Sequence, residues 1–380
     1  MNFQLSEEHL MIQQAARDYA QRELIQDVIE RDEKGIFPAK HIKALGELGF
    51  MGMMVGPEYD GGGMDTISYV LALEEITKID ASVAVVLSVN NSLVCYGINS
   101  YGTEEQKQKY LRPLARGEKI GAFLLSEPEA GSDATSQRTT AIDKGDYYLM
   151  NGTKNWITSA NSASTYIVIA QTNPEKKHKG INAFIVEKNS QGISLGPHEK
   201  KMGMRSSDTH SVMFSDVKVP KENRIGEDGF GFKFAMKTLE GGRIGIAAQA
   251  LGIASGALER SVQYSKERKA FGTEIFNHQS VAFKLADMAT DIDAARFLCL
   301  HAAWLKDQHQ PYGIASAKAK LFAAETAMRV TTEAVQIHGG YGYVAEYHVE
   351  RLMREAKLTQ IYEGTSEIQK IVISRDLIGK

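Results

Sequence analysis

One carboxylate close to the C-terminus is of a type and in a setting that could do chemistry. Glu363 follows Tyr362 and precedes the polar run Gly364-Thr365-Ser366. A carboxylate is normally a weak base, but burial disfavours its charged form and raises its pKa toward that of a general base. A dry setting beside Tyr362 would let Glu363 act as a general base. Taken alone, however, Glu363 is more simply interpreted as a surface carboxylate in front of a Gly-Thr-Ser turn.

Three other features are notable but have plain explanations when taken alone. Trp156 lies in a strand-like run and could simply be part of a core. Arg268 would ordinarily be a surface charge at a helix end, although a planar guanidinium also suits phosphate oxygens. The pair Gly339-Gly340 would let a ligand approach the backbone closely, because glycine has no side chain.

Several common active-site motifs are missing or out of place. The run Gly340-Tyr341-Gly342-Tyr343-Val344-Ala345 matches a loose G-x-G-x-x-A pattern. It follows a helical stretch rather than a strand and has no βαβ unit around it, so it does not indicate a dinucleotide-binding Rossmann fold. The sequence contains no G-x-x-x-x-G-K phosphate loop, no G-x-S-x-G elbow and no His/Cys metal spacing.

Composition limits the class of protein. The chain has 380 residues, which suggests two or three domains, and its 44 basic and 47 acidic residues give a net charge of −3. This balance argues against a nucleic-acid or membrane-surface binder. Cys95 and Cys299 are too few for a disulfide framework, and we find no apolar run near the ~18 residues of a membrane span. Because residues 1–10 lack a signal or transit pattern, we expect a soluble intracellular protein.

The elements that must position these residues change type twice along the chain. Residues 1–118 are predicted to be helical, with Ser6 as an N-cap, helical spacing over residues 6–31 and 67–93, and a capping box at 103–106. Residues 119–226 are predicted to form an antiparallel β-barrel or sandwich. Its expected parts are a hairpin of Tyr147–Met150 and Lys154–Thr158 around Asn151-Gly152, and strands at Tyr166–Ala170, Ala183–Val186 and Ser211–Val219.

Residues 227–380 show repeats at three- and four-residue steps. The apolar positions are Ile244, Ala247, Leu251, Ala254 and Leu258, then Leu285, Met288, Ile292, Ala295 and Cys299, then Ala317, Leu321, Ala324 and Met328. Three long amphipathic helices and a shorter fourth predict a four-helix bundle. The fold class is therefore α+β multidomain, with a helical domain, a β-domain and a helical bundle in that order.

Five segments together carry a family resemblance. They are Leu125–Asp133, Lys154–Thr158, Arg268–Gly272, Gln336–Gly340 and Ile361–Glu367. With these motifs in this order, the chain resembles the acyl-CoA dehydrogenase family from end to end. The resemblance implies FAD as cofactor and α,β-dehydrogenation of an acyl-CoA, in which Glu363 removes the α-proton and flavin N5 takes the β-hydride. It also implies that the Glu363 backbone N–H helps to hold the thioester carbonyl, an oxyanion-hole effect.

The resemblance assigns further residues one by one. The implied FAD contacts are Leu125, Ser126, Trp156, Ile157, Thr158, Arg268, Phe271, Gln279, Gln336, Gly339, Gly340, Thr365, Ser366 and Glu367. The implied substrate contacts are Ser132, Glu240, Arg243, Tyr362 and Gly364. In relatives the arginine matching Arg268 reaches the FAD pyrophosphate across a subunit boundary. We therefore expect at least a dimer, and a homotetramer built from two dimers.

The short-chain branch of the family is the nearest match. Isovaleryl and long-chain relatives carry the base just before the arginine matching Arg243, where this chain has Gly242. Glu240 replaces the aspartate usual in the short-chain pattern, which leaves its detailed role open. Glutaryl-type relatives place an arginine in the helix matching residues 83–92, and none occurs here, so an uncharged acyl chain such as butyryl is favoured. Branched short acyl chains are the competing substrates.

The expected partners follow from the same resemblance. An electron-transfer flavoprotein is the implied electron acceptor, and we expect no nucleic acid and no membrane insertion. A flavin oxidase or monooxygenase on the same fold would instead pass electrons to oxygen, and a non-catalytic helical binding protein would lack FAD. We expect a bacterial cytoplasmic location, with a processed mitochondrial matrix form as the alternative.

Overall fold

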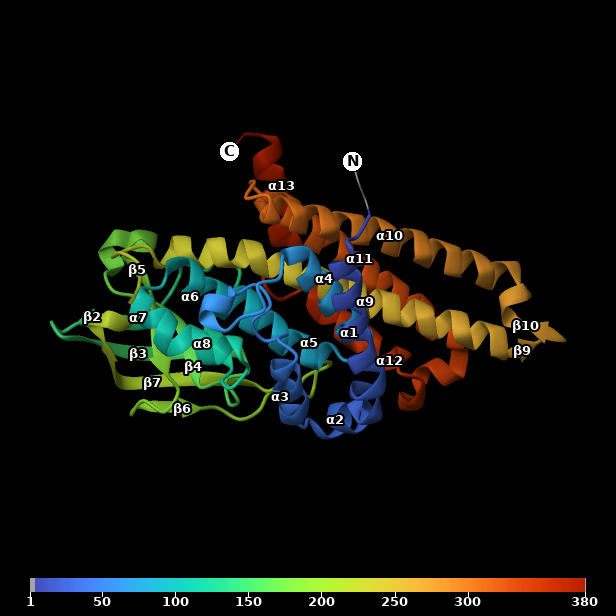
Figure 1. The fold of residues 1–380 in the computed structure, drawn as a ribbon, viewed down its shortest axis with the longest axis horizontal. Helices are drawn as coiled ribbons and strands as arrows, with labels where there is room; N and C mark the ends of the chain where they lie inside the picture. Colours follow the sequence, from blue (N-terminus) through green and yellow to red (C-terminus); the bar gives the residue numbers. More distant parts are fainter. Residues whose placement is uncertain (1–3, 380) are drawn as a thin grey trace.

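Three regions follow one another along the chain in the computed structural model, which describes residues 4–379. Figure 1 shows an elongated molecule with a β-sheet at the left end and the small hairpin of β9 (Lys269–Ala270) and β10 (Thr273–Glu274) at the right end. Helix α9 (Gly231–Glu267), 37 residues long, runs between the two ends. It packs against strand β5 (Ile181–Glu187) of the sheet and against four helices, α4 (Thr66–Thr77), α10 (Gln279–Asp307), α11 (Gly313–His338) and α12 (Val349–Thr359).

The N-terminal region is helical, as predicted, but more finely divided. Its α-helices are α1 (Glu7–Arg22), α2 (Val28–Lys34), α3 (Ala39–Glu47), α4 (Thr66–Thr77), α5 (Ala81–Ser88), α6 (Tyr96–Tyr101), α7 (Glu104–Gln106) and α8 (Arg112–Ala115). Ser6 caps α1 and Thr103 caps α7, each in a capping box, which confirms both predicted helix starts. The single helix expected over residues 6–31 is broken by a 3₁₀ turn at Leu24–Gln26.

An apolar helix runs through the middle of this region and corrects one expectation. Helices α5 and α6 are joined by the π-helix η3 (Val89–Cys95), and a second π-helix, η4 (Lys107–Leu111), precedes α8. The stretch Ala81–Tyr101 is long and apolar enough to cross a membrane by length and composition, although the sequence was expected to contain no such run. Its most apolar window is 94% buried inside the protein, which is the environment of a core helix.

The middle region is one sheet of eight strands. The strands are β1 (Gly121–Leu124), β2 (Thr140–Asp143), β3 (Tyr147–Thr158), β4 (Thr165–Gln171), β5 (Ile181–Glu187), β6 (Ile193–Leu195), β7 (Thr209–Pro220) and β8 (Arg224–Ile225). The order is β6-β7-β3-β2-β4-β5-β8, and β1 pairs with β4. Most neighbours are antiparallel, as predicted, but β4 lies parallel to both β1 and β2.

The hairpin predicted around Asn151-Gly152 is wrong. Both of its expected arms belong to the single strand β3, which pairs along its length with β7 and shows irregular register after Met150 and after Lys154. Asn151 and Asp216 hydrogen-bond to each other across the two strands, amide to carboxylate and backbone N–H to amide oxygen. Long-range pairing with β7 therefore replaces the local turn that this dipeptide ordinarily favours.

The C-terminal region is the predicted bundle with a divided last helix. Its long helices are α9, α10 (Gln279–Asp307) and α11 (Gly313–His338), and its short ones are α12 (Val349–Thr359) and α13 (Ser366–Leu377). The predicted apolar positions of α9 and α10 are buried apart from Leu258, which is half-buried, and Ala317 and Ala324 are buried on α11. The turn between α12 and α13 interrupts the fourth helix, and this turn contains Glu363.

Candidate active site

Glu363 lies in the tight turn that joins α12 to α13. Its backbone φ is 52°, a left-handed value that non-glycine residues rarely adopt, and Gly364 follows with φ 92°. Hydrogen bonds fasten the turn: Lys320 Nζ donates to the Gly364 carbonyl over 2.7 Å, and Gln369 Nε2 donates to the same oxygen over 2.9 Å. Thr365 caps α13 by accepting from the Ile368 N–H. The base candidate is therefore held on a rigid, strained turn.

The environment of the Glu363 carboxylate is that of a poised base. The residue as a whole is partly exposed, whereas its Oε2 atom is buried and has no hydrogen-bond partner among the described residues. Burial raises the pKa of Glu363 to about 7, against the opposing effect of the Lys320 and Arg243 cations. A carboxyl group with this pKa can accept a proton near neutral pH. The surface interpretation of Glu363 does not hold for this oxygen.

Helix α9 makes room for the carboxylate. A Cβ atom at Gly242 would lie 2.1 Å from Glu363 Oε2 and 2.8 Å from a methyl carbon of Leu93, so a side chain there would force the carboxylate and Leu93 to move. Arg243 is buried next in sequence, and its Nε has no partner among the described residues. Glu240, one turn earlier, is half-buried and pairs with Lys237 over 3.2 Å. The structure thus brings Arg243 close enough to Glu363 for its charge to lower the pKa of the carboxylate. Glu240 lies one turn nearer the N-terminus of α9.

Polar side chains continue beyond Glu363 into the protein interior. The Tyr362 hydroxyl donates to Gln249 Oε1, while the Gln249 amide nitrogen is buried without a partner among residues 4–379. Tyr69, on α4, donates to Ser88 Oγ over 3.1 Å. The negative charge of Glu363 helps to raise the pKa of the Tyr69 phenol. Burial raises the pKa of Tyr362 well above its usual value, so this phenol stays neutral.

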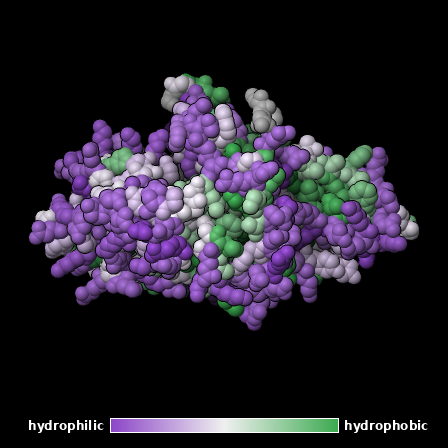
Figure 2. Space-filling view, in the orientation of Figure 1, coloured by the Kyte–Doolittle hydropathy of each residue, from purple (hydrophilic) through white to green (hydrophobic). Residues whose placement is uncertain are grey.

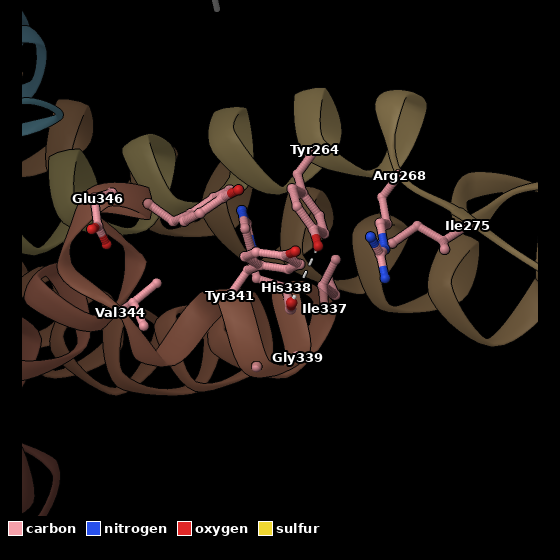
Figure 3. A pocket seen from close by; sticks show the side chains of 11 residues that line it. Tyr264, Arg268, Ile275, Ile337, His338, Gly339, Tyr341, Val344 and Glu346 are labelled. Atoms are coloured by element: carbon pink, nitrogen blue, oxygen red, sulfur yellow. Dashed lines mark hydrogen bonds between the residues drawn. The ribbon is translucent and has the colours of Figure 1, made fainter.

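A separate pocket lies at the far end of the bundle. Figure 3 shows it lined by Tyr264 on α9 and Arg268 directly after it, and by His338 at the end of α11 and Gly339 directly after it. The cavity measures about 820 Å³. A Cβ atom at Gly339 or Gly340 would meet nothing within 4 Å, so the backbone there is open to a ligand. The predicted contacts Arg268, Gly339 and Gly340 are therefore gathered in one place.

Aromatic rings form the walls of this bundle-end pocket. Tyr264 stacks on His338 with ring centroids 4.3 Å apart, and its hydroxyl donates to the His338 carbonyl over 3.4 Å. The Arg268 guanidinium lies 5.4 Å from the centre of the Tyr341 ring. Flat rings beside one cation and exposed glycine backbone suit a ligand with a planar base and a phosphate.

The third set of predicted residues lies on the β-domain. Trp156 has φ 61° and is 62% exposed, so it is not the core residue that a strand position could imply. The loop bearing Leu125 and Ser126 is tied to the same strand, since Asn155 N–H donates to the Ser126 carbonyl over 2.9 Å. Lys154, fully buried, donates to the Leu125 carbonyl over 3.0 Å and to Glu127 Oε1 over 2.7 Å.

The remaining predicted contacts occupy varied positions. Ile157 is buried in the β-domain core, Ser366 is buried with its hydroxyl on Glu325, and Thr158 is half-buried. The exposed members are Ser132, Phe271, Gln279, Gln336 and Glu367. Phe271 has φ 52° and is 98% exposed, which is unusual for a large apolar side chain. Glu363 is not among the residues that line the bundle-end pocket.

Sequence reasoning missed several residues that the structure places at these sites. Lys320 and Gln369 hold the Glu363 turn, but a lysine inside a helical repeat gives no sign that it is buried. Tyr264 could have been found, because it lies one turn before Arg268 on α9. His338 stands inside the Gln336–Gly340 motif. No group of three or more metal-ligating side chains occurs in the described part of the chain.

Comparisons with known proteins agree with this architecture. Family models of the acyl-CoA dehydrogenase N-terminal, middle and C-terminal domains match residues 6–118, 122–217 and 229–378. The matches follow the helical, sheet and bundle regions and define an oxidoreductase of three domains. The chain belongs to the acyl-CoA dehydrogenase family, which confirms the predicted family, fold class and enzyme class.

Individual relatives match over nearly their whole length. The short-chain specific acyl-CoA dehydrogenase of Clostridium acetobutylicum is 50% identical, over 98% of this chain and 99% of the relative. The structure of Megasphaera elsdenii butyryl-CoA dehydrogenase is 49% identical, with a TM-score of 0.98 and complete coverage of both chains. A chain in a structure described as the electron transferring flavoprotein of Acidaminococcus fermentans is 52% identical, with a TM-score of 0.99 and complete mutual coverage. A Mycobacterium smegmatis glutaryl-CoA dehydrogenase in complex with FADH2 is 31% identical (TM-score 0.94, 99% and 96% coverage).

Proposed function

We propose that this enzyme converts a short-chain acyl-CoA of the butyryl type into the trans-2-enoyl-CoA, with Glu363 as the base that removes the α-proton. The observation that carries this proposal is the buried, unpartnered Glu363 Oε2, whose pKa is about 7. A proton α to a thioester is weakly acidic, so its removal requires a base of this strength held close to the carbon.

The backbone of the same residue supplies the second function. Among the described residues, no acceptor is hydrogen-bonded to the Glu363 N–H, although the turn around it is otherwise well bonded. We assign this N–H to the thioester carbonyl, where it stabilises the negative charge that develops as the α-proton leaves. Removing one such donor from an enzyme typically costs about 3 kcal/mol of transition-state stabilisation.

FAD is the cofactor, in agreement with the family and with the prediction from the sequence. The residues fit it: the bundle-end pocket combines a cation, stacked rings and open glycine backbone, and Trp156 presents an exposed aromatic face. We assign Arg268, Gly339 and Gly340 to the adenosine-pyrophosphate half, and Leu125, Ser126, Trp156 and Thr158 to the ring half. When bound, FAD supplies the acceptor for the hydride that leaves the β-carbon.

A short, uncharged acyl chain fits the interior beyond Glu363. Leu93 lies against Gly242 on one side, and the Tyr362–Gln249 hydrogen bond places polar atoms deeper in the protein. An extended alkyl chain reaching that depth would pack against these polar atoms rather than an apolar wall, which favours a short chain. Branched short acyl groups differ from butyryl by about 1–3 kcal/mol per methylene, so a chain-length and branching series decides between them.

The proposal includes partners, assembly and compartment. An electron-transfer flavoprotein is the proposed acceptor, supported by the Acidaminococcus structure, whose description names that protein class. A homotetramer is supported by the apolar surface in Figure 2 over the part of the view where Figure 1 shows α10. That helix exposes Phe283, Phe297 and Trp304. We also propose the domain bounds 1–118, 119–226 and 227–380. We propose a cytoplasmic location as well, which the bacterial relatives from Clostridium and Bacillus support.

The proposal is tested on the purified, FAD-loaded protein by anaerobic titration with butyryl-CoA. The flavin absorption band of the wild type should bleach. Glu363→Gln should keep its bound FAD but lose bleaching at least ~10³-fold in rate, because an amide cannot act as a base. Glu8→Gln, an exposed carboxylate on α1, is the matched control and should react like the wild type.

Other outcomes would redirect the assignment. Substantial bleaching by Glu363→Gln would move the base elsewhere, with Glu240 examined next. Rapid reoxidation of the reduced wild type in air would indicate an oxidase or monooxygenase rather than a dehydrogenase. A colourless protein that does not take up FAD would overturn the proposed function as a whole.

A further inference from the structure

A buried lysine reaches the Glu363 turn from helix α11. Lys320 has no exposed surface, and its Nζ donates to the Gly364 carbonyl over 2.7 Å. This carbonyl belongs to the peptide that follows Gly364, so the hydrogen bond holds the C-terminal side of the two consecutive left-handed residues, Glu363 and Gly364. Lysine is rarely buried completely unless its charge is paired, because removing an ammonium from water is costly.

The ammonium group of Lys320 is electrostatically coupled to the carboxylate of Glu363. The hydrogen-bond acceptor of Lys320 is a neutral carbonyl. Among carboxylates, Glu363 has the largest electrostatic effect on the pKa of Lys320, larger than that of Glu325 or Glu367. Burial lowers the pKa of Lys320 to about 8, so the ammonium form still predominates at neutral pH. A methionine would fill the same space without this cost, which leaves the charge itself to be explained.

Charged and titratable groups surround Glu363 from every element packed on it. Arg243 faces it from α9, Lys320 from α11 and the Tyr69 phenol from α4, and Tyr362 precedes it in the turn. Both phenols are neutral, since burial raises their pKa values above the usual range. The two cations therefore counteract the effect of burial on the carboxylate, and Lys320 is the larger of the two influences.

We propose that Lys320 is a positioning residue of the active site, which holds the Gly364 carbonyl and sets, through its charge, the pH range in which Glu363 is ionised. The proposal rests on the assignment of Glu363 as the base. It adds a function to a helix that otherwise serves the bundle core. Loss of the cation leaves burial opposed by Arg243 alone, so Glu363 would ionise at higher pH.

The experiment compares pH profiles of kcat/KM for butyryl-CoA in FAD-loaded wild type, Lys320→Met and Lys320→Arg. The profile reports the pKa of the base in the free enzyme. In Lys320→Met the rising limb of the profile should move up by about 1 pH unit. The kcat/KM of this variant should therefore be about tenfold below that of the wild type at pH 6 and should largely recover at pH 9. Lys320→Arg restores the cation and should bring the limb back toward the wild-type position. Lys318→Met, exposed on the same helix, is the matched control.

The outcomes separate this inference from the proposed function. A merely structural role predicts an equal loss at every pH, with arginine no better than methionine, and either result overturns the inference. If Lys320→Met does not accumulate with FAD, Lys320→Gln replaces it, because the amide keeps a donor but carries no charge; an unshifted limb in that variant also overturns the inference. Bleaching that survives in Glu363→Gln contradicts the proposed base itself, whatever the profile of the lysine variants.

Discussion

Three predicted site residues share an uncommon backbone conformation. Trp156, Phe271 and Glu363 have φ values of 61°, 52° and 52°. Left-handed backbone costs a non-glycine residue on the order of 1 kcal/mol, and it persists where surrounding structure holds it. All three also place their side chains in unfavourable surroundings: two large aromatic groups are exposed and one carboxylate oxygen is buried. The free-energy cost of the backbone and side-chain conformations at these three positions is therefore offset by stabilising interactions elsewhere in the fold.

The buried carboxylate predicts a pH-dependent stability difference. The pKa of Glu363 is raised from 4.5 to about 7 in the folded protein. Its contribution to stability is therefore fully present below pH 4.5 and is lost as the pH rises through 7. Glu363→Gln, which cannot ionise, should escape this loss and gain about 1–3 kcal/mol over the wild type between pH 5 and pH 8. Thermal unfolding of both proteins at the two pH values, with Glu8→Gln as control, measures the difference; an equal pH dependence would contradict it.

At the level of elements, helices could be predicted well and strand pairing could not. Helix starts at Ser6 and Thr103 depend on local side-chain caps, and the buried positions of α10 follow a local period, so the sequence contains the information. The pairing of β3 with β7 depends on residues about 65 positions apart, such as Asn151 and Asp216. Local turn chemistry at Asn151-Gly152 pointed to the wrong structure because it could not include that distant partner.

Strand β3 also carries the buried lysine that organises the loop before the proposed flavin ring site. Lys154 joins the Leu125 carbonyl to Glu127, and Glu127 in turn accepts from the backbone N–H groups of Arg138 and Thr139. Lys154→Met should leave Glu127 buried and unpaired and loosen this loop, which costs about 3–5 kcal/mol in comparable buried pairs.

We expect Lys154→Met to bind FAD at least tenfold more weakly, because Leu125 and Ser126 lose their support. The measurement is a fluorescence titration of the apoprotein with FAD, accompanied by circular dichroism to establish that the fold is kept. Lys144→Met, exposed beyond β2, should bind like the wild type. Unchanged affinity in a folded Lys154→Met would show that the loop does not need the ion pair.

At the scale of the whole molecule, the order of the three regions was predictable from changes in period, but the distribution of the site was not. The sequence alone did not indicate how the motifs that contain Arg268 and Glu363 lie relative to each other in space. The structure places Arg268 at the bundle end, beside Tyr341, and Glu363 in a turn against the middle of α9 near Gly242. In the proposed homotetramer, a site shared between two subunits would bring Arg268 of one subunit and Glu363 of another to one FAD.

Shared sites predict complementation between two inactive variants. In a mixed dimer of Arg268→Ala and Glu363→Gln subunits, one site would combine an intact Arg268 from one subunit with an intact Glu363 from the other. We expect mixed oligomers, isolated with two different affinity tags, to regain about half of the wild-type activity at limiting FAD. Each variant alone should be much less active under the same conditions. Failure of the mixed species to exceed the separate variants would mean that Arg268 and Glu363 of one subunit serve the same FAD, which would contradict a site shared between subunits.

The π-helix η3 has a geometrical consequence for the acyl end of the site. Each residue of an α-helix advances about 100° around the axis, so one extra residue in a turn shifts the phase of everything beyond it. Leu93, inside Val89–Cys95, lies beside Gly242 in this shifted phase. Deleting one residue before it would leave an equally apolar and helical segment, yet rotate a different side chain toward the carboxylate. The helix phase of η3, rather than its composition, therefore decides which side chain lies beside the carboxylate.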